Sequence, residues 1–435
     1  MSPIDLYREI DAKLRSLVPK TGPAFSSGVN LRLERIERLM ASLGSPHHSY
    51  RSIHVGGTSG KGSTANIVEA GLRQAGMKTG LHTSPHLQII NERHRVDGVL
   101  LSTTALNRVF DRLWPHVLDV GTGCEWGLPS YFEAQVAISL LAFADERVDV
   151  AVVEVGLGGT LDATNVLPAE TVVITNVGLD HTEILGNTVE EIAKDKAGII
   201  KEGTRVVVTG ATQESVRRII ERRCRAVGSD LIVVDTNHED AQRANFQVAD
   251  AALKTFGVGL PNGLSGTTIA GRFERVQSDP TVVLDGAHNS EKMLALSRWI
   301  ARQKRPEQRS VVVLGVKLGK DLRSILRAVD PRCSILIATE FRMSSGLWSS
   351  VEAAVLADVW REAESERNCT TIVEPDPLRA VETAIALAIS QGIDDVVVTG
   401  SLYLVGNVRE KWVPSEWLIK AAEQNLVRGD LRPNR

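Results

Sequence analysis

Apolar residues recur three and four positions apart in three stretches near the start of the chain. The stretches cover residues 4–18, 31–43 and 63–75, and this spacing places the apolar side chains on one face of an α-helix. A short apolar run at 53–55 precedes the third stretch and is separated from it by glycines. The pattern predicts two N-terminal helices, followed by a strand, a glycine-rich turn and a third helix.

Later apolar runs are continuous, which is typical of strands buried on both faces of a parallel sheet. One series lies at 148–155, 171–175, 205–208 and 231–234. A second lies at 282–284, 310–314, 334–338, 371–373 and 396–399, with helical patterns such as 291–303 and 378–390 between the runs. Strands that alternate with helices predict an α/β fold with two parallel sheets. We place the first domain at 1–270, a linker at 271–280 and a smaller domain at 281–435.

Composition excludes several classes of protein. The 50 Lys and Arg residues are balanced by 53 Asp and Glu, a formal net charge of −3, which argues against a broad basic face for nucleic acid. No run approaches the ~20 apolar residues of a membrane span. The N-terminal segment MSPIDLYREIDAKLRSL is too acidic for a signal peptide. The four cysteines are widely spaced with no pairing motif, which indicates reduced thiols and no disulfide framework. We therefore expect a soluble cytoplasmic protein that binds neither nucleic acid nor a membrane, by default a monomer.

The sharpest local signal is the glycine-rich stretch GGTSGKGST between the expected strand and helix. Its glycines let backbone N–H groups turn inward, and a helix N-terminus adds partial positive charge, so the segment favours a polyphosphate. The spacing departs from the standard Walker pattern, and the alternative is a strand-to-helix turn with an incidental lysine. The strand–loop–helix context favours an ATP-type nucleotide. The candidate phosphate-binding residues are Gly57, Thr58, Ser59, Gly60, Lys61, Gly62 and Ser63. Residues 1–270 are thereby predicted to form a P-loop-containing ATPase domain, and 281–435 a doubly wound, Rossmann-like domain.

Carboxylates and a histidine follow the expected strands of the first domain. Glu154 ends a strand and precedes glycines, the position at which α/β sheets bind ligands, and Mg²⁺ prefers such oxygen donors. The alternative is a carboxylate that caps a helix or faces solvent. His181 follows the strand at 171–175 beside Asp180, where a hydrogen-bonded loop histidine is the alternative to a metal ligand. Asp162 is equally ambiguous, because aspartate favours turns.

A lysine falls on the apolar face of the helix expected over 187–200. Asn187 and Glu190 predict a capping box, and Lys194 lies four residues after Glu190 as an exposed pair. Lys196 instead lies among the apolar residues of the buried stripe. Burial of a free ammonium is costly, so Lys196 pairs with an acid, extends its ammonium to solvent, or is carbamylated by CO2 into a metal-binding anion.

The motifs together resemble the folylpolyglutamate synthase/dihydrofolate synthase family of the Mur ligase superfamily. The resemblance runs through GGTSGKGST, TSPHLQIINERHRVDG, SYFEAQVA, EVGLGGTLDATNV, ITNVGLDHTEILGNTVEEIAKDKAGIIK, GRFE, DGAHN and VVVTGSLYLVG, almost the whole chain. It implies an ATP- and Mg²⁺-dependent ligase of folate biosynthesis and one-carbon metabolism. A carboxylate of dihydropteroate or a reduced folate would attack the γ-phosphate of ATP, and the amine of L-glutamate would displace phosphate from the acyl phosphate.

The resemblance also implies roles for particular residues. Those of the phosphate loop would bind ATP, with Arg272 and Asp285 contacting it from the linker and second domain. The magnesium ligands would be Ser84, Glu154, His181 and a carbamylated Lys196. Phe132 and Asp162 would lie on the pterin side, and His288, Ser401 and Tyr403 would place glutamate. The residues expected to carry catalysis are Lys61, His181, Lys196, Asp285 and His288.

Two positions depart from the family pattern. Thr160 replaces an arginine before LDATN, and Asp250 replaces an asparagine expected near the nucleotide. These departures leave open a second reading, in which the same fold joins an amino acid to a non-folate carboxylate. A P-loop switch protein that does not ligate is a third, but it would need no amino-acid pocket around His288 and Ser401.

Overall fold

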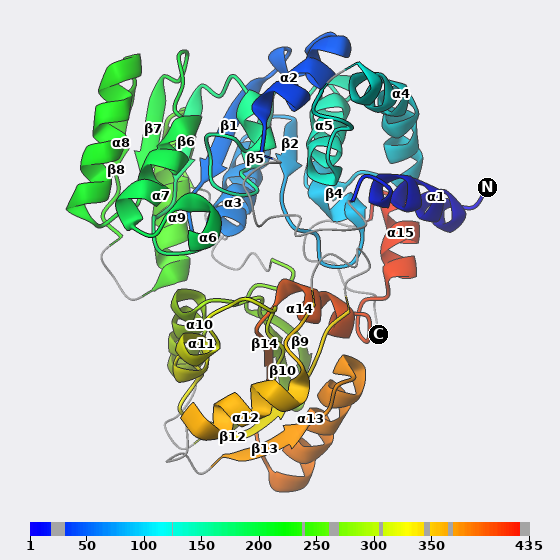
Figure 1. The fold of residues 1–435 in the computed structure, drawn as a ribbon, viewed down its shortest axis with the longest axis vertical. Helices are drawn as coiled ribbons and strands as arrows, with labels where there is room; N and C mark the ends of the chain where they lie inside the picture. Colours follow the sequence, from blue (N-terminus) through cyan, green and yellow to red (C-terminus); the bar gives the residue numbers. More distant parts are fainter. Residues whose placement is uncertain are drawn as a thin grey trace. The chain divides into compact units, whose positions relative to one another are not determined.

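The computed structural model (Figure 1) describes residues 1–18, 31–123, 125–236, 240–260, 269–303, 308–342, 349–363 and 369–426. These residues form two compact units. Unit 1 contains the described residues up to 260 together with 418–426, and unit 2 contains those from 269 to 417. Both units are α/β, which confirms the predicted fold class.

Unit 1 is built on an eight-stranded sheet with the order β4-β3-β2-β5-β1-β6-β7-β8. From β2 to β8 in this order, neighbouring strands are parallel. At the other end of the sheet, β3 pairs antiparallel with both β2 and β4. The strands are β1 (Arg51–Gly56), β2 (Thr79–His82), β3 (His94–Val96), β4 (Val99–Leu100), β5 (Val150–Glu154), β6 (Thr171–Ile174), β7 (Val206–Thr209) and β8 (Asp230–Val233).

Helices cover both faces of this sheet. Because side chains alternate along a strand, Ala151 and Val153 of β5 face one helical layer, and Val150 and Val152 face the other. The first layer holds α5 and the second holds α3 and α9. The helices of unit 1 are α1 (Pro3–Arg15), α2 (Leu33–Ser42), α3 (Lys61–Gln74), α4 (Thr103–Thr122), α5 (Tyr131–Asp145), α6 (Thr182–Leu185), α7 (Val189–Lys196), α8 (Glu214–Val227) and α9 (Ala241–Lys254), with short 3-10 turns at η1 (Pro46–His48), η2 (Ile90–Arg93), η3 (Ala163–Val166) and η4 (Ala197–Ile199).

Unit 2 holds a six-stranded sheet with the order β13-β12-β11-β14-β10-β9, parallel except for β9. Its strands are β9 (Glu274–Ser278), β10 (Thr281–Leu284), β11 (Ser310–Leu314), β12 (Cys333–Ala338), β13 (Thr370–Val373) and β14 (Asp395–Thr399). Its helices are α10 (Ser290–Gln303), α11 (Leu322–Arg327), α12 (Ala353–Ala363), α13 (Pro377–Gln391) and α14 (Leu402–Arg409). The last helix, α15 (Ser415–Glu423), begins in unit 2 and continues into the residues grouped with unit 1.

The structure differs from the expected linker at 271–280. Residues 274–278 of that segment form β9, which pairs antiparallel with β10 as an edge strand. Its sequence ERVQS contains no apolar run. One of its buried positions is the charged Glu274, which pairs with the buried Arg409 at 3.1 Å. A strand whose inward side chain is charged escapes a search for continuous hydrophobic residues.

The helix expected over 187–200 is also adjusted. Thr188, one residue later than predicted, caps α7, and its hydroxyl and Glu191 complete the capping box in place of Asn187 and Glu190. The α-helix ends at Lys196, and η4 continues the turn. Among the helices of the described residues, none combines the length and the apolar character that a membrane span requires.

Candidate active site

Most residues predicted for the site lie at the carboxyl ends of parallel strands, in segments that follow β1, β2, β5 and β6 in unit 1 and β10 and β14 in unit 2. This is the edge at which open α/β sheets bind ligands. Figure 1 shows these strands, and the exceptions are Phe132 in α5, Lys196 at the end of α7 and Arg272 just before β9. The phosphate loop joins β1 to α3, and Gly57 and Gly60 adopt φ angles of 139° and 80°, which favour glycine. The loop is held by the next strand, because Asn176 accepts the backbone N–H groups of Thr58 and Ser59 at 3.0 and 2.8 Å.

Two lysines meet at one carbonyl of this loop. The Nζ atoms of Lys61 and Lys196 each donate to the Gly57 carbonyl oxygen at 3.0 Å. Lys196 is only 4% exposed and reaches the loop from the last turn of α7, so its predicted place on the buried face is confirmed. The Lys61 ammonium beside a helix N-terminus concentrates positive charge at the loop, which suits a polyphosphate.

A carboxylate lies beside the first turn of α3. Glu154, at the end of β5, is buried, and its Oε2 accepts the backbone N–H of Ser84 at 3.0 Å. A Cβ added to Gly62 would lie 3.2 Å from both carboxylate oxygens, so the acid packs directly on the phosphate loop. Oxygen donors next to bound phosphates fit Mg²⁺, which usually takes one or two protein carboxylates and completes its shell with phosphate and water.

His181 lies at the start of α6 with a φ of 51°. Its ring nitrogens are 3.9 Å from Asp180 Oδ1 and 3.7 Å from Glu183 Oε1. Within the part of the chain that the structure describes, no group of three or more His, Cys, Asp and Glu side chains is placed to hold a metal ion. Glu154 and Ser84 lie together beside the phosphate loop, and the roles of Ser84, Glu154, His181 and Lys196 as metal ligands stay predictions.

Gly57 offers a test of the loop. A Cβ there would collide with the Thr175 hydroxyl and lie 3.2 Å from the Asn176 carbonyl oxygen. We expect Gly57→Ala to lower the free energy of unfolding by about 3 kcal/mol through strain and overpacking, and to abolish ATP binding. Urea unfolding and calorimetric titration with ATP measure the two effects. The control is Gly203→Ala, where φ is 88° but nothing lies within 4 Å, so only the backbone cost of about 1 kcal/mol applies. Equal losses in the two variants would contradict this account of the loop.

The two residues predicted on the pterin side meet in unit 1. Phe132, in the first turn of α5, and the Asp162 carboxylate both lie against Gly156, where an added Cβ would clash with the ring and lie 3.1 Å from Asp162 Oδ2. Asp162 accepts the Leu157 N–H at 2.8 Å and the hydroxyl of Thr164. Burial raises the pKa of Asp162 despite these hydrogen bonds, so Asp162 holds a proton more readily than an exposed aspartate does.

Close to Phe132 and Asp162 runs a row of histidines that the sequence analysis missed. His54 of β1, His82 of β2 and His94 of β3 share one register row across the sheet, with Val153 of β5 between the first two. All three rings are fully buried. His54 Nε2 lies 2.8 Å from the hydroxyl of Thr164, which links it to Asp162. Single histidines within apolar segments carried no spacing signal, so only the sheet register reveals the row.

Burial predicts a pH dependence of stability. It lowers the pKa of His54 from 6.5 to about 3, with the charge of Lys201 adding to the effect. The unfolded chain therefore binds a proton that the folded chain refuses, so stability is intact above about pH 6.5 and is lost as the pH falls toward 3. Between pH 7 and 5, His54→Gln should lose about 2 kcal/mol less stability than the wild type in urea unfolding. His48→Gln, at the surface, is the control, and parallel pH profiles for His54→Gln and the wild type would contradict the prediction.

Unit 2 carries the remaining candidates on two neighbouring loops. After β10, the buried Asp285 accepts the N–H groups of Phe273 and Ala287 at 2.9 and 2.8 Å. Burial raises the pKa of Asp285, and the charge of Arg272 opposes this shift. The loop after β14 lies alongside, because the Gly400 N–H donates to the Ala287 carbonyl at 2.9 Å.

The candidate glutamate residues occupy these same two loops. His288 donates from Nδ1 to the Gly286 carbonyl at 2.7 Å and accepts the Lys292 ammonium on Nε2 at 3.0 Å, which defines a neutral ring. Ser401 caps α14 by accepting the Tyr403 N–H at 3.1 Å, and the Tyr403 ring stacks on Phe341 with centroids 6.0 Å apart. Unit 2 thus brings Arg272, Asp285, His288, Ser401 and Tyr403 to one edge of its sheet.

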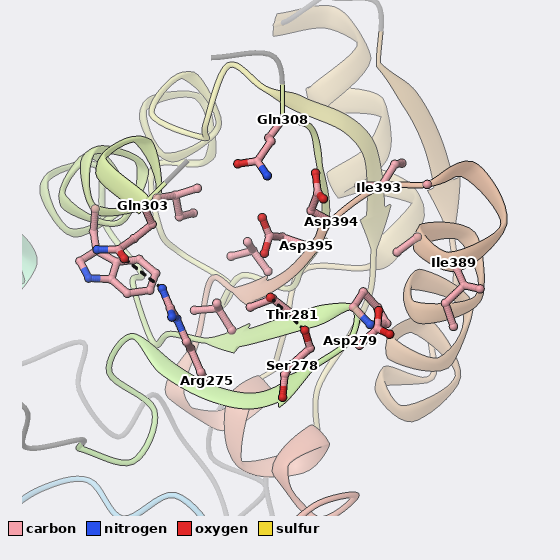
Figure 2. Close-up of a pocket in the computed structure, with 17 residues that line it drawn as sticks. Arg275, Ser278, Asp279, Thr281, Gln303, Gln308, Ile389, Ile393, Asp394 and Asp395 are labelled. Atoms are coloured by element: carbon pink, nitrogen blue, oxygen red, sulfur yellow. Dashed lines mark hydrogen bonds between the residues drawn. The ribbon is translucent and has the colours of Figure 1, made fainter. Parts of the chain in front are cut away.

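A separate hollow of about 640 Å³ in unit 2 lies at the opposite edge of that sheet (Figure 2). Its lining includes Thr281 at the amino end of β10 and Asp395 at the amino end of β14, with Arg275 and Trp299 beside them. It contains none of the predicted site residues.

The two departures from the family pattern have local structural roles. Thr160 donates through its N–H and hydroxyl to the Asp195 carbonyl at 3.0 and 2.9 Å, so it ties the loop after β5 to α7. Asp250 accepts the Leu260 N–H at 3.1 Å and pairs with Lys254 at 2.7 Å. The sequence analysis also missed Asn245, whose amide lies against Gly60 of the phosphate loop and adds a polar group there.

A first unit whose phosphate loop joins β1 to α3, followed by a second unit with a Rossmann-like sheet, has the architecture of a nucleotide-dependent ligase of the Mur type. The Mur ligase middle domain matches residues 55–274, about half of the chain, and the C-terminal domain of dihydrofolate synthetase matches 270–411. The chain belongs to the dihydrofolate synthase/folylpolyglutamate synthase family, which confirms the resemblance of its motifs.

Individual relatives agree. The dihydrofolate synthase/folylpolyglutamate synthase of Bacillus subtilis is 32% identical over 88% of this chain and 95% of its own length. A probable bifunctional folylpolyglutamate synthase/dihydropteroate synthase of Halobacterium salinarum is 34% identical over 86% of this chain, which spans only 48% of that longer protein. Among solved structures, folylpolyglutamate synthase of Mycobacterium tuberculosis, complexed with ADP and AMPPCP, superposes with a TM-score of 0.84 at 29% identity, covering 94% of this chain and 99% of that one.

Proposed function

We propose that this protein is an ATP-dependent ligase that joins L-glutamate to dihydropteroate, to reduced folates or to both, through an acyl phosphate. The observation that carries the proposal lies in unit 1. There the phosphate loop follows β1, and Lys61, Lys196 and Glu154 lie around it. Phe132 and Asp162 lie against Gly156, which follows the neighbouring strand β5 at the same edge of the sheet. A nucleotide site and an organic-acid site on one edge fit direct attack of a carboxylate on the γ-phosphate.

Similar solved structures hold the corresponding ligands. One is the Escherichia coli enzyme in complex with DHPP and ADP, at 26% identity and a TM-score of 0.78. Another is a bifunctional folylpolyglutamate synthase/dihydrofolate synthase with Mn, AMPPNP and L-glutamate bound, at 26% identity and a TM-score of 0.73. Their nucleotide, divalent metal, acceptor and amino acid support the same four ligands here, with Mg²⁺ as the metal. We further propose that the enzyme acts as a monomer in the cytoplasm.

The reaction follows from the charges of the site. A carboxylate oxygen of the acceptor attacks the γ-phosphorus, the bond to the β–γ bridging oxygen breaks, and ADP leaves. The glutamate amine then attacks the acyl carbon, and the tetrahedral intermediate expels inorganic phosphate as the amide forms. Lys61 and the N–H groups of the phosphate loop stabilise the growing negative charge on the phosphate oxygens. Mg²⁺, when bound, supplies further positive charge, and Glu154 and Ser84 are the residues that would hold it.

The other residues position the reactants. We assign Phe132 and Asp162 to the bicyclic ring of the acceptor, by stacking and by hydrogen bonding. Arg272 and Asp285 would contact the nucleotide, and His288, Ser401 and Tyr403 would orient L-glutamate. The hydrogen bonds to Gly286 and Lys292 use both nitrogens of the neutral His288 ring and fix its orientation in the loop after β10. We assign carbamylated Lys196 to the metal, with His181 as a further ligand.

Release of phosphate from ATP and Mg²⁺ tests the proposal. L-glutamate is supplied with dihydropteroate, with tetrahydrofolate or with no acceptor, and mass spectrometry identifies the product. We expect turnover only when acceptor and glutamate are both present. Turnover with dihydropteroate assigns the synthase step, and turnover with tetrahydrofolate assigns chain extension. ATP binding with no turnover on either acceptor would refute the folate assignment and favour ligation to another carboxylate, the reading left open by Thr160 and Asp250.

A further inference from the structure

One face of α5 is polar although the helix lies inside an apolar core. Helix α5 is buried from Glu133 to Phe143, mostly by aliphatic side chains. Phe132, Gln135 and Ser139 are spaced three and four residues apart, so they share one face of the helix. That face packs against the histidines of β2 and β3. Gln135 and Ser139 are both 0% exposed, so contact with water does not account for their polar side chains.

These side chains form a continuous chain of hydrogen bonds. Gln135 Oε1 lies 2.9 Å from His94 Nε2, and His94 Nδ1 lies 2.6 Å from the Ser139 hydroxyl. The same hydroxyl lies 2.7 Å from His82 Nδ1. The chain therefore connects α5 to two neighbouring strands, β3 and β2, through a single serine.

The chain has a defined direction. The amide oxygen of Gln135 can only accept, so His94 donates from Nε2 and, as a neutral ring, accepts on Nδ1. The Ser139 hydroxyl must then donate to His94, and its lone pair accepts the Nδ1–H of His82. His82 is left with an unprotonated Nε2, which is buried and has no hydrogen-bond partner among the described residues. Opposite tautomers for His82 and His94 follow from the geometry.

This hydrogen-bond chain ends at His82, close to Phe132 and to the Ser84–Glu154 pair, which we assign to the acceptor and to the metal. The centroid of the His82 ring lies 6.3 Å from that of Phe132, which packs on Gly156 with Asp162. Two residues after His82, the Ser84 N–H is bound to Glu154. A displacement of α5 on the sheet would therefore move the Phe132 ring relative to the phosphate loop.

We propose that His82 is a positioning residue for the acceptor, acting through Ser139, His94 and Gln135 to hold Phe132 against Gly156 and so to set the KM for the carboxylate substrate. The inference rests on the proposed function, since it assigns Phe132 to the acceptor. A broken chain leaves buried polar atoms unpaired, which the helix relieves by shifting. ATP and glutamate do not depend on that helix face, so their KM values should stay unchanged.

The test is steady-state kinetics of Ser139→Ala, His82→Gln and His82→Asn in the full-length enzyme. Ser139→Ala removes both hydrogen bonds of the central hydroxyl, and His82→Gln removes one of them. Each should raise the acceptor KM about tenfold, because either change disconnects His82 from α5. The KM values for ATP and L-glutamate should stay within twofold. His82→Asn should restore the wild-type acceptor KM, since its amide nitrogen replaces Nδ1, whereas glutamine places its amide at the other ring nitrogen. The double variant Ser139→Ala/His82→Gln should be no worse than either single variant, because both break one chain.

Two controls separate positioning from folding. Ser42→Ala removes a surface serine–histidine hydrogen bond, 3.0 Å from His116 Nδ1, and should leave every KM unchanged. If Ser139→Ala fails to fold, nitrogen-15 NMR of the wild type still tests the chain. We expect the proton of His94 on Nε2 and that of His82 on Nδ1, and the same tautomer at both histidines would overturn the proposal.

The outcomes also separate this inference from the proposed function. A wild type that turns over no folate-type acceptor overturns both. A wild type that turns over its acceptor, with an unchanged acceptor KM in Ser139→Ala and His82→Gln, overturns the positioning role alone. An ATP KM that rises as much as the acceptor KM also overturns it, because the chain would then be a general structural element.

Discussion

Replacement of Lys196 by alanine is expected to lower kcat by about a thousandfold, the scale on which a lost charge-stabilising group acts in an enclosed site. Lys196 is buried at the end of α7, and its Nζ reaches the Gly57 carbonyl of the phosphate loop at 3.0 Å. A carbamate formed there would present anionic oxygens toward the metal beside Glu154. The alanine variant loses that anion as well as the hydrogen bond that ties α7 to the loop.

Chemical rescue of the alanine variant by small ions distinguishes a carbamate at Lys196 from an unmodified ammonium. Acetate or formate added to Lys196→Ala should restore part of the activity, because a small carboxylate occupies the position of the missing carbamate. Lys196→Arg should stay inactive, since it retains positive charge where an anion is required. Lys194→Ala, on the exposed face of the same helix, is the control and should keep wild-type kcat. Full activity in Lys196→Ala would contradict the carbamate assignment. Rescue by ammonium salts, and not by carboxylates, would show that the site requires a positive charge and would contradict it as well.

The second large effect is expected for Glu154→Gln. Glutamine keeps the shape of the side chain and an oxygen that accepts the Ser84 N–H, now at 3.0 Å, but it removes the negative charge beside Gly62. We expect kcat to fall about a hundredfold and the Mg²⁺ concentration for half-maximal activity to rise about tenfold, because a neutral amide is a weaker ligand of a hard cation. Titration of activity with Mg²⁺ at saturating ATP measures both changes.

Glu146→Gln provides the matched control. Glu146 forms a partly exposed ion pair with Lys78 at 3.2 Å, so its substitution should change neither kcat nor the Mg²⁺ titration. An unaltered Mg²⁺ requirement in Glu154→Gln would show that this carboxylate is structural, and that its bond to the Ser84 N–H is the reason for its burial.

The continuous apolar runs predicted the central strands well, because strands covered on both faces by helices must be apolar throughout. Strands β2 and β3, which follow the edge strand β4 in the order of the sheet, were missed for the opposite reason. β2 reads TGLH and β3 reads HRV, so each contains polar residues in place of an apolar run. Their inward positions hold His82 and His94, which are satisfied by side chains of α5 rather than by hydrophobic contact.

Long-range geometry accounts for what the sequence did not reveal about the site. The place of Lys196 on a buried helix face was predictable from spacing, but its contact with Gly57 depends on how α7 meets the phosphate loop, 139 residues away in the chain. The meeting of Phe132 with Asp162 likewise requires Gly156, whose missing side chain leaves room for the ring. Such contacts arise from the packing of elements and have no local signature.

The transfer of oxygen from the acceptor to phosphate tests the central claim most directly. Dihydropteroate labelled with oxygen-18 in its carboxylate is incubated with ATP, Mg²⁺ and L-glutamate, and the released phosphate is analysed by mass spectrometry. An acyl phosphate places one carboxylate oxygen in the phosphate, so we predict one labelled oxygen per phosphate released from fully labelled acceptor. Unlabelled phosphate, released while the amide still forms, would contradict activation of the carboxylate by the γ-phosphate.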